Sequence, residues 1–261
     1  MPTTFAARGQ AMRLLTYNIH KGIGGSDRHY RLDRIIRVVE EQKPDLVCLQ
    51  EVDRHVHRSH FHDQPTLLAS ALNLSHFLYQ LNVPIREGGY GNLLLSRWPI
   101  RSFEQVSLRR TWRKPRGAQV AVIETPDGPL QLVNWHLGLA EHERRWQVRL
   151  LLDHATFLEG LCHPTLVTGD FNDWRNTLGR LLFEPNQFEQ VTDPSRHFRS
   201  FPAWFSVLAL DKVFRRGSIE VGECRVIRDA LTHRASDHLP VVLDFAIAGE
   251  KGVTDSRVAS D

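Results

Sequence analysis

Cysteine is scarce in this sequence, and long hydrophobic runs are missing from it. The 261 residues include three cysteines, Cys48, Cys162 and Cys224, with no C-x-x-C spacing among them. An odd count without paired spacing argues against a disulfide framework and indicates free thiols in a reducing compartment. No apolar run is long enough to span a bilayer, and the N-terminus lacks the apolar region of a secretory signal. We therefore expect a cytoplasmic protein without a transmembrane segment.

Several catalytic and nucleotide-binding motifs are also absent. There is no G-x-S-x-G elbow, so a serine-centred triad has no support in the sequence. There is neither a P-loop lysine motif nor a G-x-G-x-x-G after a strand, which removes the usual cues for nucleoside triphosphate and dinucleotide folds. No internal repeat and no low-complexity linker divides the chain, which is typical of one domain.

Basic residues gather in one segment of an otherwise ordinary composition. With 41% hydrophobic and 24% charged residues and a net charge of +3, the chain has no overall signature of a polyanionic partner. Within residues 107–117, however, five basic residues surround Trp112. This segment either holds a phosphate-bearing substrate by charge and stacking or is a solvated loop, and the sequence alone favours the loop. The five are Arg109, Arg110, Arg113, Lys114 and Arg116.

Hydrophobic periodicity predicts a mixture of strands and helices. A helix is expected across Leu32–Val39, where apolar residues recur at i, i+3, i+4 and i+7. A second helix begins at Gln64-Pro65, and a third, long helix is expected over roughly 141–159. An Asp-Gly turn at 127–128 joins two apolar runs and predicts a β-hairpin. The expected strands are 12–19, 46–50, 92–96, 119–125, 129–137, 165–170, 208–214, 218–227 and 240–248.

These elements predict an α/β fold with a sandwich architecture. Helices are too few for a strict βαβ repeat, and the hairpin requires antiparallel pairing, so we expect strands in two packed sheets with helices on the outer faces. Residues 12–248 are expected to form a single catalytic domain. Residues 249–261, which are small and polar, are expected to form a flexible C-terminal tail.

Polar side chains stand at the ends of many of these strands. Any one of them could be a turn residue, and a lone His136 is more often a core histidine than a catalyst. Their number is harder to explain by turns, because buried acids are costly unless they are paired or bound to a cation. Carboxylates and amides without clustered thiolates favour Mg²⁺ or Mn²⁺ over zinc, and nearby histidines suit phosphoryl chemistry. The residues are Asn18, Glu51, Asn92, His136, Asp170, Asn172, Asp211, Asp237 and His238.

Seven blocks of sequence stand in a characteristic order: "LLTYNIHKG", "DLVCLQEVD", "GNLLLSRWPI", "LVNWHLGL", "VTGDFND", "LALDKVF" and "ASDHLPVVL". Together they resemble the motifs of the endonuclease/exonuclease/phosphatase superfamily, which includes pancreatic deoxyribonuclease, abasic-site endonucleases, neutral sphingomyelinases and inositol-polyphosphate phosphatases. The resemblance covers residues 13–246 and is greatest to small bacterial members. It implies a four-layered α/β sandwich, in which two packed mixed β-sheets are flanked by helices.

The resemblance also implies a metal site. Glu51 matches the principal Mg²⁺ ligand of the family, with Asn18 beside it and Asp237 completing or supporting the site. Mn²⁺ is expected to substitute for Mg²⁺. The cation would polarise the phosphate of the substrate.

Catalytic roles follow from the same resemblance. Asp170 matches the residue that positions or activates the attacking water, and Asn172 the residue that holds the scissile phosphate. His238 matches the essential histidine, and Asp211 the carboxylate that orients its ring. His136 matches the second histidine of the deoxyribonuclease and sphingomyelinase branches.

Three further residues are expected to contact substrate. Asn92 stands where some relatives orient the second histidine with a carboxylate, so an amide here departs from the pattern. Arg116 belongs to the basic segment around Trp112. Trp204, just ahead of Asp211, forms either an aromatic wall over the substrate or ordinary core packing.

The predicted function is that of a Mg²⁺-dependent hydrolase of phosphodiester or phosphomonoester bonds, acting by in-line attack of water. Nucleic acid, a phospholipid headgroup and a small phosphorylated metabolite are all open as substrates, and the oligomeric state cannot be read from the sequence. The alternative is a non-catalytic metal- or phosphate-binding scaffold of the same fold. Degenerate scaffolds are expected to lose Glu51, Asp170 or His238, and this chain keeps all three.

A histidine-rich stretch allows one further interpretation. His55, His57, His60 and His62 directly follow the Glu51 block, and H-x-H spacing on an extended segment could bind Zn²⁺. No cysteine or further histidine block completes a compact site, so an exposed polar loop is the favoured interpretation.

Overall fold

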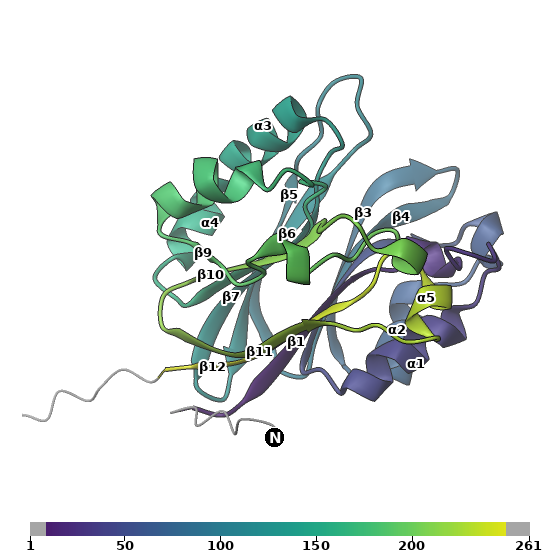
Figure 1. The fold of residues 1–261 in the computed structure, drawn as a ribbon, viewed down its shortest axis with the longest axis horizontal. Coiled ribbons are helices and arrows are strands. Elements are labelled where there is room, and N and C mark those ends of the chain that lie inside the picture. The colour runs from purple at the N-terminus through teal and green to yellow at the C-terminus, as the bar shows by residue number, and fades with distance from the viewer. Residues whose placement is uncertain (1–8, 249–261) are drawn as a thin grey trace, which may run out of the picture.

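The structure, a computed structural model, describes residues 9–248, and two six-stranded sheets pack face to face within it (Figure 1). The first sheet consists, in spatial order, of β11 (Ile219–Val226), β12 (Val241–Ile247), β1 (Met12–Asn18), β2 (Leu46–Arg54), β4 (Gly88–Ser96) and β3 (His76–Ile85). The second consists of β5 (Ile100–Ser107), β6 (Gly117–Thr125), β7 (Gly128–His136), β8 (Thr165–Asp170), β10 (Asp211–Arg216) and β9 (Glu189–Gln190). Both are mixed, since β1–β2 and β7–β8 are parallel pairs and the other pairs are antiparallel.

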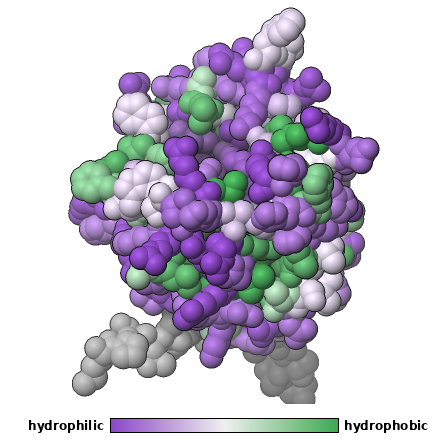
Figure 2. Space-filling view, turned by 90° about the vertical axis from the view of Figure 1, so that its right-hand side faces the viewer, coloured by the Kyte–Doolittle hydropathy of each residue, from purple (hydrophilic) through white to green (hydrophobic). Residues whose placement is uncertain are grey.

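Helices cover the outer face of each sheet (Figure 1). The first sheet carries α1 (Leu32–Gln42), α2 (Gln64–Ala71) and α5 (Thr232–Ala235), and the second carries α3 (Glu141–Leu152) and α4 (Ala155–Gly160). The expected fold class, a four-layered α/β sandwich with two packed mixed sheets, is confirmed. On the side that bears α1 and α2 the surface is largely hydrophilic, with hydrophobic residues in separate patches (Figure 2).

The layering produces three apolar clusters. Leu14 belongs to the cluster between the sheets, whereas its neighbour Leu15 packs with Ile35 of α1. A third cluster joins Trp135 of the second sheet to Val148 of α3. Successive residues of a strand point to opposite faces, and here both faces are buried, so these strands appear in the sequence as continuous apolar runs.

The long helix expected over 141–159 is two helices in the structure. His154 adopts an extended conformation, with φ −77° and ψ 130°, and begins α4 as its N-cap. The change of direction brings Phe157 into the cluster under α3 and leaves Leu158 51% exposed. The prediction of one continuous helix was therefore wrong. The core buries Phe157, which does not lie on the apolar face predicted for that helix.

Strands at the sheet edges differ most from expectation. β3 and β5 carry no continuous apolar run, since an edge strand exposes many of its side chains and tolerates polar residues. The strand expected over 208–214 begins only at Asp211, because Leu208 forms an isolated bridge with Phe201. The hairpin of β6 and β7 is confirmed at its Asp-Gly turn.

Buried amides join the two sheets between their apolar faces. Asn134 of β7 accepts a hydrogen bond from Gln50 of β2 at 2.8 Å. Its Nδ2 lies within 3.2 Å of the carbonyl oxygens of Leu49 and Leu93, both in the first sheet, and 2.9 Å from Oε1 of Gln119. The spacing between the sheets is therefore set by directional hydrogen bonds as well as by apolar packing.

No helix in the described part of the chain is long and apolar enough to cross a membrane. The expected tail, residues 249–261, lies outside the described residues.

Candidate active site

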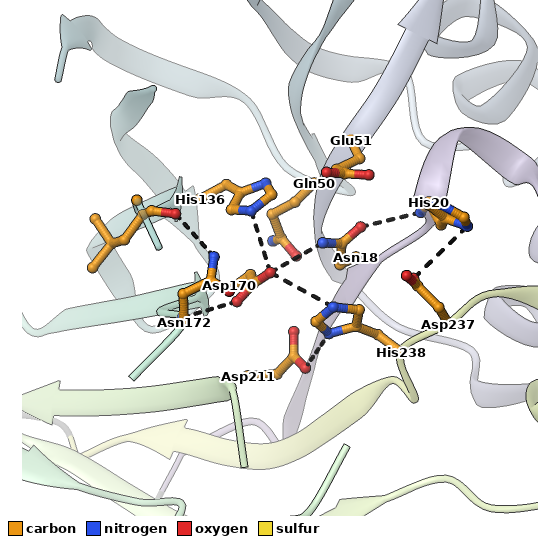
Figure 3. Close-up of polar contacts among 12 residues, drawn as sticks. Asn18, His20, Gln50, Glu51, His136, Asp170, Asn172, Asp211, Asp237 and His238 are labelled. Atoms are coloured by element: carbon orange, nitrogen blue, oxygen red, sulfur yellow. Dashed lines mark hydrogen bonds and ion pairs between the residues drawn. The ribbon is translucent and has the colours of Figure 1, made fainter. Parts of the chain in front are cut away.

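Asp170, the last residue of β8, is the point on which the predicted residues converge (Figure 3). Its Oδ2 accepts a hydrogen bond from Asn18 Nδ2 at 3.0 Å and lies 3.3 Å from His136 Nε2 and 3.7 Å from His238 Nε2. Its Oδ1 accepts the backbone N–H of Asn172 at 2.9 Å. Four of the predicted residues thus contact one buried carboxylate.

Strand register explains this convergence. His136 of β7 and Asp211 of β10 are the direct cross-strand partners of Asp170, so three polar side chains form one row at the end of the second sheet. Asn18 ends β1 in the first sheet, where its partner in β2 is Gln50. The site therefore lies where the ends of the two sheets meet (Figure 3).

His238 is held by a carboxylate from the other sheet. Its Nδ1 lies 2.8 Å from Asp211 Oδ2, and Ser200 Oγ donates to the same oxygen at 2.5 Å. Burial alone would lower the pKa of His238, but the Asp211 and Asp170 carboxylates outweigh it and raise this pKa to about 10. His238 is therefore an imidazolium at neutral pH.

The other two central groups take different charge states. Burial raises the pKa of Asp170 to about 6, although the nearby His238 imidazolium lowers it. Burial, and then the Arg116 guanidinium, hold the pKa of His136 well below its ordinary value. At neutral pH the site accordingly combines an ionised Asp170, a neutral His136 and a charged His238.

Glu51 reaches the site through an irregularity of β2. The register of β2 against β4 shifts between Leu49 and Val52, and Glu51 has a left-handed φ of 58°. Bulges of this kind re-aim side chains next to active sites. The Glu51 carboxylate meets the Lys21 ammonium in a short ion pair. Burial would raise the pKa of Glu51, but the Lys21 ammonium outweighs it and holds this pKa well below its usual range.

The oxygen atoms near Glu51 fit a hard divalent cation. The contact with Lys21 shows that this carboxylate already accepts a positive charge, and Asn18 adds an amide oxygen. Asp237 lies beside His20, with Oδ1 3.9 Å from its Nδ1 (Figure 3). Within residues 9–248, no three His, Cys, Asp or Glu side chains form a preassembled metal cluster. Substrate and water oxygens would have to complete the coordination, as is common for Mg²⁺.

Asn172 and Asp173, which follow Asp170, have different roles. Asn172 adopts a left-handed φ of 51°, which asparagine tolerates, and its Nδ2 donates to the Leu137 carbonyl at 2.9 Å. Asp173 is fully buried and accepts the backbone N–H of Leu178 at 2.9 Å. Asp173 therefore supports the loop that follows β8.

Among the described residues, none of the three predicted substrate residues hydrogen-bonds to Asp170, although the Arg116 guanidinium lies near enough to His136 to lower its pKa. Asn92 is buried, and its Nδ2 donates to the Gly117 carbonyl at 3.0 Å. Arg116 is only 7% exposed, and its Nε has no hydrogen-bond partner among the described residues. Trp204 is 54% exposed, so it does not pack in the core, and its turn is tied to Asp237 through the backbone N–H of Ala203. Substrate contact by these three residues stays a prediction.

The histidine-rich stretch lies beside Tyr30. The ring centroids of His60 and His62 are 6.1 Å apart, and the Tyr30 hydroxyl is 2.9 Å from His62 Nδ1. His57 instead packs edge-on against Phe61. His60 and His62 thus share one aromatic cluster with Tyr30, whereas His55 Nε2 lies 3.8 Å from Asp63 Oδ2.

Several residues that shape the site were not among the predicted ones. Lys21 pairs with Glu51, and Ser200 supports Asp211. Ser236 Oγ donates to the Asn18 carbonyl at 2.7 Å and accepts the His238 backbone N–H at 3.3 Å. Gln50 donates a hydrogen bond to Asn134 and so joins the two sheets next to the site. Lys21, Gln50 and Ser236 stand inside recognised motifs, and that proximity is the signal that could have identified them, whereas Ser200 lies outside all seven motifs.

Two mixed sheets packed between helices, with a carboxylate–histidine cluster where their ends meet, define an α/β sandwich of the phosphoesterase type. A family model described as the Endonuclease/Exonuclease/phosphatase family matches residues 15–238, and the chain belongs to that family. Members of this family are hydrolases that act on phosphoester bonds.

The relatives support the same assignment over nearly the whole chain. An uncharacterised protein of Escherichia coli K12, YbhP, is 31% identical over 243 residues, which is 88% of this chain and 94% of its own length. A solved endonuclease/exonuclease/phosphatase from Beutenbergia cavernae has a TM-score of 0.75 at 22% identity, covering 92% of this chain and 72% of that one. The structure of a mannosyl-6-phosphatase from Bacteroides thetaiotaomicron has a TM-score of 0.69 at 18% identity, covering 90% and 99%. These structural matches establish the fold.

Proposed function

We propose that this protein hydrolyses phosphate esters with the help of a divalent cation, Mg²⁺ or Mn²⁺, by in-line attack of water. The observation that carries the proposal is the convergence of Asn18, His136 and His238 on Oδ2 of Asp170. A carboxylate that is buried, kept ionisable near neutrality and surrounded by histidines is suited to proton transfer. Membership of a phosphoesterase family supports the reaction class.

Asp170 is the proposed base. A pKa of about 6 leaves it ionised at neutral pH yet close enough to accept the proton of an attacking water. The Asn18 amide fixes its Oδ2, and the Asn172 N–H fixes its Oδ1, so the carboxylate is oriented before substrate arrives. Such prior orientation lowers the entropic cost of reaching the transition state.

His238 and His136 are proposed to face the phosphate. The His238 imidazolium, held by Asp211 through Nδ1, has its Nε2 N–H available to stabilise charge on phosphate oxygens. The neutral His136 supplies a hydrogen bond without adding a full charge. Asn172 is proposed to hold the phosphate from the adjacent turn.

Glu51, Asn18 and Asp237 are proposed to hold the cation. A bound Mg²⁺ would polarise the phosphate and offset the negative charge that develops on it. Lys21 already balances the charge of Glu51, so the carboxylate is ionised and ready for a cation at any physiological pH.

The chemical class of the ester is open between diester and monoester. One structural relative is a mannosyl-6-phosphatase, and the resemblance of the sequence motifs extends to deoxyribonuclease and sphingomyelinases. We propose a phosphate-ester substrate drawn from nucleic acid, a phospholipid headgroup or a small metabolite. We also propose that residues 12–248 act as one catalytic domain in the cytoplasm.

The test is hydrolysis of bis-p-nitrophenyl phosphate and p-nitrophenyl phosphate with Mg²⁺, with Mn²⁺ and with EDTA. The proposal expects metal-dependent release of p-nitrophenol that is lost in Asp170→Asn and in His238→Ala. Activity that persists in EDTA would contradict the metal requirement. Activity that survives both substitutions would contradict the assignment of the site.

A further inference from the structure

Three cationic side chains surround one tyrosine ring beside Glu51. Tyr90 of β4 is only 5% exposed. Lys21 Nζ lies 5.4 Å from its ring centroid, Arg58 Cζ 5.2 Å and Lys114 Nζ 5.1 Å. They come from three separate segments, the loops after β1 and β2 and the basic segment before β6. Favourable contact with the face of the ring helps to hold each cation.

The charges of this cluster are only partly balanced. The Lys21 ammonium pairs with Glu51, and the Arg58 guanidinium pairs with Asp53 through Nε at 2.9 Å and Nη2 at 2.6 Å. Lys114 forms no ion pair with any residue of the described range 9–248. Three positive charges around one ring repel one another. The cluster therefore keeps a net positive charge, which favours binding of an anion.

The cluster adjoins the proposed reaction centre. Lys21 touches both groups, since its ammonium contacts Glu51 and lies over the Tyr90 ring. In Figure 3, Glu51 lies at the opposite side of the site from Asp211, so the cations extend the site away from His238. An anion bound here would therefore neighbour the phosphate at Asp170 without occupying the same place.

We propose that Lys21, Arg58 and Lys114, arranged over Tyr90, form a second phosphate subsite. It binds a phosphate group of the substrate other than the one that is hydrolysed. This inference rests on the proposed function and narrows it to esters that carry at least two phosphates. Guanidinium and ammonium groups together match the spread of charge on a phosphate dianion.

Lys114 is the residue that tests the subsite most directly. It is exposed and without an ion pair in the described range, so Lys114→Ala removes one ligand without leaving a carboxylate unpaired. Arg113 is the matched control, because it is an exposed cation of the same loop with no place over the Tyr90 ring. A general attraction by the basic segment would respond equally to both substitutions.

The experiment is isothermal titration calorimetry of the whole protein in EDTA, which prevents metal-dependent turnover of the ligands. One pair of probes is thymidine 3′,5′-bisphosphate and thymidine 5′-phosphate. The second pair is inositol 1,4-bisphosphate and inositol 1-phosphate. The subsite predicts that a bisphosphate binds about tenfold more tightly than its monophosphate. Lys114→Ala should reduce this preference severalfold, and Arg113→Ala should reduce it less.

The outcomes separate the two proposals. A preference confined to the nucleotide pair assigns the second phosphate to a nucleic-acid strand, and one confined to the inositol pair assigns it to a phosphorylated polyol headgroup. Equal binding of mono- and bisphosphates in both pairs, or equal effects of the two substitutions, overturns the subsite. Because calorimetry needs no turnover, a protein that prefers bisphosphates but releases no phosphate from them with Mg²⁺ or Mn²⁺ would keep the subsite and lose the hydrolase.

Discussion

His238 Nδ1 and Asp211 Oδ2 lie 2.8 Å apart although the strands that position them belong to different sheets. Asp211 opens β10 in the second sheet, and His238 lies in the loop before β12, which begins at Val241 in the first. The pair therefore orients the imidazole and also ties the two halves of the site together. It makes the charge state of His238 depend on a residue that lies 27 positions away in the sequence.

Asp211→Asn should move the alkaline limb of the pH–rate profile. Without the carboxylate, the pKa of His238 falls by about one unit or more, since an opposite charge at this distance shifts a pKa by that amount. The imidazolium is then lost at lower pH, and activity at pH 9 should fall more than activity at pH 7. The measurement is kcat/KM against pH for both proteins. An unchanged alkaline limb would show that Asp211 does not set the charge of His238.

The wild-type enzyme should have a bell-shaped pH profile. Activity should rise as Asp170 ionises, around its pKa of about 6, and fall as His238 loses its proton, around its pKa of about 10. The signs follow from a base that must be deprotonated and an imidazole that must be protonated. The profile is measured as kcat/KM at constant ionic strength and metal concentration. Activity that falls with rising pH between 5 and 7 would remove Asp170 from the role of base.

Asp170→Asn and Asp173→Asn should have opposite consequences, although only two residues separate them. The first removes the proposed base and should reduce kcat by about 10²- to 10⁴-fold. The second weakens the hydrogen bond to Leu178 and should cost about 1–3 kcal/mol of stability while the folded protein stays active.

Turnover and thermal denaturation of both variants distinguish the two roles. The raised pKa of Asp170 means that its ionised form opposes folding above about pH 6, so Asp170→Asn should not lower the melting temperature at neutral pH. A variant of Asp173 that melts like the wild type but has lost turnover would reverse the assignment.

Lys21→Met should change how the protein responds to Mg²⁺. Glu51 then lacks its partner, and the loss of one member of a largely buried ion pair should destabilise the metal-free protein by about 3 kcal/mol. A divalent cation can restore the balance, so the rise in melting temperature on adding Mg²⁺ should be larger in Lys21→Met than in the wild type. Lys21→Arg, which keeps the charge, is the control. An identical Mg²⁺ response in Lys21→Met and wild type would argue against cation binding at Glu51.

The sequence was most informative for segments in which burial alone decides which residues are tolerated. Strands buried on both faces must be continuously apolar, so β1, β2 and β8 could be located directly, and polar residues at their ends stood out against that background. The convergence of His136, Asp170 and Asp211 could be anticipated through resemblance, and strand register is the physical reason for it.

The remainder depends on contacts that only the folded chain brings together. Lys21 follows β1 and meets Glu51 only because a bulge in β2 turns that carboxylate toward it. The break between α3 and α4 allows Phe157 to pack in the apolar cluster between the second sheet and α3. In the sequence, Tyr90 is one more residue of an apolar strand. Only the structure shows that three cations from distant loops surround it. Such features have no periodic signal, because they depend on tertiary neighbours.

Asn134 links the protein interior to the proposed active site. Its hydrogen bonds to Gln50 and to the carbonyls of Leu49 and Leu93 fix how far apart the two sheets stand just below the site. Asn18 and Glu51 are carried by one sheet and Asp170 by the other, so that separation is also the gap across which substrate must fit. A substitution that adds a methyl group between the sheets should strain the core and widen this gap, so that stability and the proposed activity would fall together.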